Sequence, residues 1–70
     1  MLSDTDFIAL NAIYLKKMAT AAMIAEATAL PIETVSGCLA AAAEQAWIMD
    51  MPTGAMLLDE GIAQVLAHYR

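Results

Sequence analysis

PIETVSGCLAAAAEQA, residues 31–46, is the stretch from which the fold can be worked out. Proline suits the first position of a helix, because the N–H that it lacks would have no partner there. The apolar side chains that follow recur at the spacing of one helical face. We therefore expect a helix whose buried stripe consists of Val35, Cys38, Leu39, Ala42 and Ala46.

The opposite face of this helix should be exposed. On a helical wheel it consists of Glu33, Ser36, Gly37, Ala40, Ala41 and Glu44. Small side chains thus lie between two carboxylates, and the stretch contains no lysine or arginine. Because proteins gain most of their affinity for DNA by neutralising phosphates with basic side chains, this face disfavours nucleic acid. The six residues are instead candidates for binding a protein partner.

Two further helices are expected before residue 31. Ser3 and Asp6 have the spacing of a helix cap, and the helix that they begin should end near Lys16 and Lys17. Thr20 is a good N-cap for a second helix, from residue 21 to about residue 28, with Ile24 and Ala27 facing inward. Ala29 and Leu30 then form the turn that leads to Pro31.

A hairpin and a terminal helix are expected after residue 46. The short apolar segments 47–49 and 56–58 flank Pro-Thr-Gly and predict two strands joined by a turn. Asp59 and Glu60 favour the start of a helix. Its apolar stripe would consist of Ile62, Val65, Leu66 and Tyr69. The expected architecture is mainly α with a small β-hairpin wing, in the order α-α-α-β-β-α, as a single domain of residues 1–70.

Two segments resemble a known family. Residues 19–49, ATAAMIAEATALPIETVSGCLAAAAEQAWIM, resemble the helix-turn-helix of MarR-type winged-helix proteins, and residues 53–61, TGAMLLDEG, resemble the end of their wing. The resemblance implies a winged helix-turn-helix fold. This chain departs from the pattern because Ala29 and Ala46 stand where glycine is common, and the wing tip at 51–55 has no arginine. The resemblance extends more loosely to helix-turn-helix segments appended to bacterial metabolic enzymes, such as phosphoenolpyruvate-utilising ones.

The composition of the whole chain also disfavours nucleic acid and favours a protein partner. Three basic and eight acidic residues give the chain of 70 residues a formal net charge of -5, which disfavours nucleic acid and anionic membranes. Hydrophobic residues make up 61% of the sequence, more than so small an interior can hold, so some apolar surface is expected to face a partner. No run is long enough to span a membrane and the first residues are acidic, so we expect a cytoplasmic protein.

Residues that could support chemistry are sparse. No Ser, His and Asp set, glycine-rich phosphate loop or carboxylate pair stands out, so no catalytic residue and no cofactor are predicted. Cys38 and His68 together fall short of a zinc site, and no metal is expected. We expect Cys38 to be a core residue, Trp47 to cover the core, and His68 to lie at a helix end without a carboxylate to orient it. The chain is therefore not expected to be an enzyme.

Two hypotheses follow for the function. The first is a protein–protein interaction module, a subunit or regulator that docks on a larger protein such as a metabolic enzyme, or on itself, through the exposed helix face and the wing. The alternative is a dimeric, DNA-binding transcriptional regulator of MarR-like type. They differ in what the face between Glu33 and Glu44 contacts. In both, Leu39 should be the centre of a core that also contains Phe7, Ile24, Val35, Trp47, Leu57 and Leu66.

Overall fold

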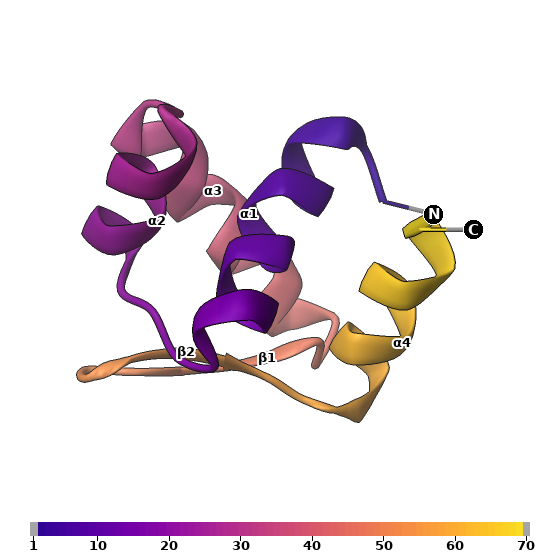
Figure 1. Ribbon diagram of the computed structural model, residues 1–70. Coiled ribbons are helices and arrows are strands. Elements are labelled where there is room, and N and C mark those ends of the chain that lie inside the picture. Colours follow the sequence, from indigo (N-terminus) through magenta and orange to yellow (C-terminus); the bar gives the residue numbers. More distant parts are fainter. Residues whose placement is uncertain (1, 70) are drawn as a thin grey trace.

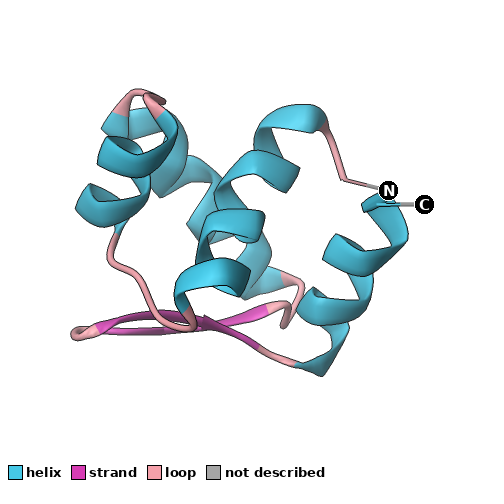
Figure 2. Ribbon diagram, viewed as in Figure 1, coloured by secondary structure: helices cyan, strands magenta, loops and turns pink. Residues whose placement is uncertain are grey.

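A computed structural model describes residues 2–69 of the chain. Over these residues the elements are α1 (Asp4–Lys16), α2 (Ala21–Thr28), α3 (Ile32–Glu44), β1 (Ile48–Met51), β2 (Gly54–Leu57) and α4 (Asp59–Tyr69). The fold is mainly helical with one antiparallel hairpin, as Figure 2 shows. The order α-α-α-β-β-α confirms the predicted winged-helix-like arrangement.

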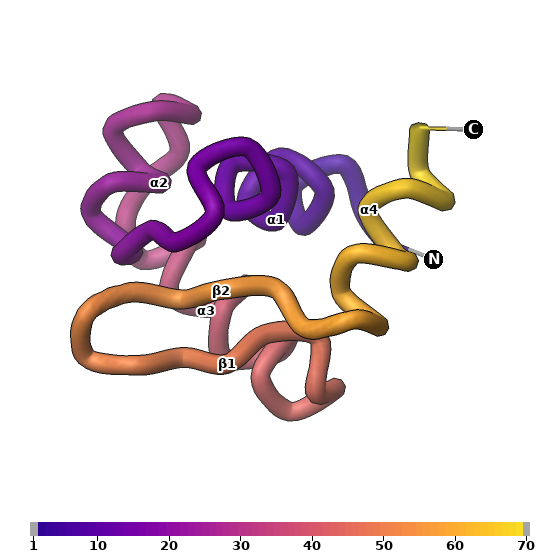
Figure 3. Tube along the Cα trace, turned by 60° about the horizontal axis from the view of Figure 1, so that its bottom comes forward, coloured from indigo at the N-terminus to yellow at the C-terminus, as the bar shows by residue number. Residues whose placement is uncertain are grey.

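Helix α1 is the centre of the molecule. It packs against α2, α3, α4 and β2, while α3 packs against α2 and β1 (Figure 1). The hairpin runs along one side of the helices, with β2 next to α1 and β1 next to α3 (Figure 3). Ala19 and Ala55 exchange two backbone hydrogen bonds of 3.0 and 2.7 Å, which tie the hairpin to the segment between α1 and α2.

The predicted helix caps are confirmed. The Ser3 hydroxyl accepts a hydrogen bond from the backbone N–H of Asp6 at 3.1 Å, and the Thr20 hydroxyl accepts one from Met23 at 3.2 Å. Helix α2 has the predicted bounds, and α1 ends at Lys16. Pro31 differs from its predicted place by one residue, since it is the N-cap of α3 and Ile32 is the first helical residue.

The strands are placed slightly differently from the prediction, whereas α4 begins at Asp59, as predicted. The strands occupy residues 48–51 and 54–57, so Trp47 and Leu58 lie outside them. The backbone N–H of Leu58 donates to the Trp47 carbonyl at 2.8 Å. This bond holds the residue before α4 against the link between α3 and β1. Gly61 allows this contact, because a Cβ there would lie 2.0 Å from the same carbonyl oxygen.

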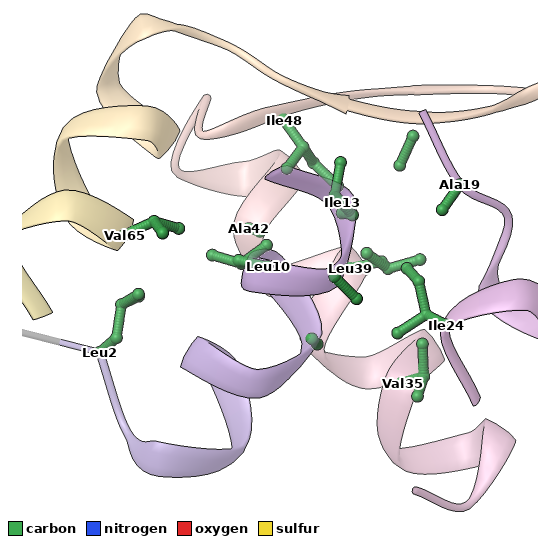
Figure 4. Packing of buried hydrophobic residues seen from close by; sticks show 13 residues of the cluster. Leu2, Leu10, Ile13, Ala19, Ile24, Val35, Leu39, Ala42, Ile48 and Val65 are labelled. Carbon is green, nitrogen blue, oxygen red and sulfur yellow. The ribbon is translucent and has the colours of Figure 1, made fainter. Parts of the chain in front are cut away.

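The core lies between α1, α2 and α3 and extends to α4 and the hairpin. Leu10, Ile13, Ile24, Val35 and Val65 are its largest fully buried side chains. Figure 4 shows the labelled side chains of these elements pointing toward one another. Among residues 2–69 no buried side chain is polar or charged. The fold is therefore held mainly by apolar burial, aided by local capping hydrogen bonds.

The predicted stripe on α3 is confirmed except at its end. Val35, Leu39 and Ala42 are buried, and Cys38 is half-buried. Ala46 is exposed, because α3 ends at Glu44 and Ala46 turns the chain toward β1 with a φ of 59°. Including Ala46 in the buried stripe was therefore wrong.

Two alanines adopt the left-handed conformation that favours glycine. Ala29, between α2 and α3, has a φ of 62°, close to that of Ala46. The left-handed region costs an L-residue about 1–2 kcal/mol, because Cβ comes close to the following carbonyl oxygen. The backbone is thus strained at both alanines.

Three apolar residues predicted to face inward are on the surface instead. Leu66 is 39% exposed while Val65 is fully buried, because neighbours on a helix point about 100° apart and the packing of α4 turns Val65 toward the core. Tyr69 and Ala27 are also exposed. Of the other residues in the predicted core, Phe7, Trp47 and Leu57 are half-buried and pack against its edge.

We predict that Leu39→Ala leaves the isolated chain largely unfolded. Leu39 is 4% exposed, and truncating a buried leucine costs about 2–5 kcal/mol, a large share of the stability of so small a domain. Circular dichroism and thermal melting measure the loss. Leu66→Ala is the matched control and should melt close to wild type. Equal melting of the two variants would show that the burial assigned to α3 is incorrect.

Candidate functional site

The six residues predicted to bind a partner lie together on the exposed face of α3. Glu33, Ser36, Gly37, Ala40, Ala41 and Glu44 are all exposed. They point away from the core because Val35, Leu39 and Ala42 occupy the opposite side of the same helix. A Cβ added at Gly37 would meet no atom within 4 Å. We call these six residues the outer face of α3.

Two carboxylates border the outer face at its ends. Glu33 lies in the first turn of α3, where the helix dipole favours an anion, and Glu44 is the last helical residue, where the dipole disfavours one. Within residues 2–69 neither carboxylate forms an ion pair. Both negative charges are therefore available to basic groups of a binding partner.

The outer face continues into a hollow beside the hairpin. Ser36 lines this hollow together with Thr20 at the start of α2 and Asp50, Met51 and Pro52 of the hairpin. Sequence stretch 31–58, which covers α3 and the hairpin, contains no lysine or arginine. The surface formed by α3 and the wing is thus acidic, with small side chains at its centre.

The hairpin carries two exposed methionines on the face that points away from the buried Ile48 and Ala55. Met49 and Met56 are direct cross-strand partners, and both are exposed. Methionine side chains are flexible and polarisable, so they adapt to differently shaped apolar partners. The wing therefore offers adaptable apolar contacts in place of phosphate-binding side chains.

Cys38 is held in its protonated form. Burial, together with a hydrogen bond to Asp6 and the negative charge of that residue, raises the pKa of the Cys38 thiol from 9.0 to about 11. A thiol becomes a nucleophile or a metal ligand only as the thiolate. Its surroundings thus suit the core role predicted from the sequence.

His68 has partners that the sequence did not reveal. Its ring stacks on Phe7 with centroids 4.1 Å apart, and its Nε2 lies 3.8 Å from the Asp4 carboxylate. The prediction that no carboxylate is placed near His68 was wrong, because packing of α4 on α1 brings the two ends of the chain together. Tyr69 adds a hydrogen bond to Asn11, so these contacts join α4 to α1.

The described residues offer little for other kinds of site. No group of three or more His, Cys, Asp or Glu side chains within residues 2–69 could hold a metal ion. Over the same residues, no helix has the length and apolar character needed to cross a membrane.

A second surface was missed by the sequence analysis. A groove between α1 and α2 is lined by the outward-facing Ile8 and Leu15 of α1 and by Ala27 of α2. The sequence signal is a pair of apolar residues seven positions apart, outside the buried stripe of the same helix. Exposed apolar side chains in a groove mark a surface that can bind a partner.

No protein-family model and no curated protein sequence matches this chain. The function is therefore argued from the geometry and charge of the surfaces above.

We predict that Cys38 in the folded chain is alkylated by iodoacetamide with a pH midpoint near 11. At pH 8 the reaction should be about 100-fold slower than in urea, because a pKa raised by two lowers the thiolate fraction about 100-fold. Mass spectrometry follows the modified fraction. A folded chain that reacts as fast as the unfolded chain would contradict the protonated, half-buried thiol.

Proposed function

We propose that this chain is a protein–protein interaction module. It acts as a small subunit or regulator that docks on a larger protein through the outer face of α3 and the adjoining wing. A metabolic enzyme is the partner class that we favour, on the looser resemblance to segments appended to such enzymes. The chain itself has no catalytic role in this proposal.

The observation that carries the proposal is the composition of the outer face. Small side chains at Ser36, Gly37, Ala40 and Ala41 let the backbone of a partner approach α3 closely. Glu33 and Glu44 lie at the two ends, where charged groups of an interface remain partly hydrated and set its orientation. A partner with a shallow ridge flanked by basic side chains complements this surface.

A DNA-binding regulator is the second candidate, and the α-α-α-β-β-α order is the observation that favours it. In helix-turn-helix proteins the second helix of the motif, here α3, enters the major groove. Its outer face would then bring two carboxylates and no cation to the phosphates. Lys16 and Lys17 lie at the end of α1, so their charges are not on this face. The charge distribution therefore favours protein over DNA.

We predict that Ala40→Arg prevents capture of the partner from a lysate of the native cell. The arginine adds bulk at the centre of the outer face, and Ala40 is exposed, so the fold should be retained. The expected loss of affinity is more than about tenfold, measured on the captured partner once mass spectrometry has identified it.

Ala63→Arg is the matched control, because Ala63 is an exposed helical alanine on α4. It should bind the partner as wild type does, and both variants should melt within a few degrees of wild type. Equal binding by Ala40→Arg and Ala63→Arg would place the docking surface elsewhere on the molecule.

A further inference from the structure

The groove between α1 and α2 lies on the side of α1 that faces away from the core. Ile8 is 41% exposed and Leu15 is 68% exposed. Asn11 and Ala12 lie between them, and Ala27 and Thr28 of α2 form the other wall. Leu10 and Ile13 occupy the buried side of α1, which packs toward α3. The groove and the outer face of α3 therefore point in different directions.

The spacing on α1 suits packing against another helix. Asp4, Ile8, Asn11 and Leu15 follow one another at intervals of four, three and four residues, the alternation seen where two helices pack along a common seam. The side chains between the two ends of this stripe are uncharged. The seam thus has an apolar middle that a second helix could cover.

The two ends of α1 carry opposite charges. The Asp4 side chain, in the first turn, is 97% exposed although it lies 3.8 Å from the His68 Nε2. Lys16 ends the helix and Lys17 follows it, so two of the three Lys and Arg residues of the chain lie at this end. A partner of uniform charge would complement one end of α1 and be repelled at the other.

An inverted copy of the same helix complements both ends. We infer that the groove binds a second copy of this chain, with the two α1 helices antiparallel. Ile8 of each copy then lies opposite Leu15 of the other. In this register Asp4 lies three residues beyond Lys16 of the other copy, an offset that the long lysine side chains at 16 and 17 can span. A two-fold axis generates each contact twice, as in most protein dimers. This dimer does not depend on the proposed function of α3.

The dimer is expected to be weak. A standard interface buries about 800 Å² of each partner, more than one face of a short helix supplies. The net charge of -5 on each chain adds repulsion between the copies. We therefore expect a dissociation constant on the order of tens of micromolar. Both outer faces of α3 remain free, so the dimer could engage a symmetric partner at two sites.

Sedimentation equilibrium of the full chain, from about 10 µM to about 1 mM, tests this inference. Wild type should move from monomer to dimer over this range, and Leu15→Glu should remain a monomer. Ile32→Glu is the matched control, because it makes a similar change at an exposed residue of α3, and it should dimerise as wild type does. Circular dichroism verifies that both variants are folded.

A charge exchange tests the antiparallel arrangement. Asp4→Lys and Lys16→Glu should each weaken the dimer several-fold, and the double variant should recover most of the loss. A wild-type chain that stays monomeric at about 1 mM would overturn the inference. So would dimers that Leu15→Glu leaves intact, dimers that Ala40→Arg abolishes, or a double variant no stronger than the single ones.

Discussion

Burial of one stripe of α3 against α1 and α2 determines which side of this helix faces outward. Val35, Leu39 and Ala42 are the residues of α3 that enter the core. Because they fix the rotation of the helix, they also decide which residues face outward. Basic residues on the outer face of α3 would suit DNA, but this face carries serine, glycine, alanine and two glutamates. The surface chemistry of the protein is thus set by its packing.

The strained alanines show how α3 is held in this position. Ala29 precedes α3 and Ala46 follows it, each with a left-handed backbone that costs about 1–2 kcal/mol. The turns keep this conformation because burial on both sides overdetermines the path of the chain. Ile24 is fixed in the core before Ala29, and Ile48 is fixed after Ala46. Tertiary packing therefore outweighs the local preference of alanine.

Local signals predicted most of the fold and the exposed side of α3. The Ser3 and Thr20 caps were recognised because each helix start is encoded within a few residues. Leu66 was misassigned because Val65 and Leu66 are equally apolar and only the docking angle of α4 decides which is buried. The contact of His68 with Asp4 joins opposite ends of the chain, and no local pattern encodes it. The α1 groove was missed because helical periodicity was used to find the core, not apolar residues outside it.

We propose that the outer face of α3 is suited to protein and not to DNA. Amide NMR spectra of the ¹⁵N-labelled chain, recorded with and without mixed-sequence duplex DNA at about 50 mM salt, test it most directly, since phosphate-driven binding is strong at low salt. We expect the amide signals of Ser36, Gly37, Ala40 and Ala41 to stay unchanged when DNA is added. Shifts of these signals that grow with DNA and disappear as salt is raised would contradict it.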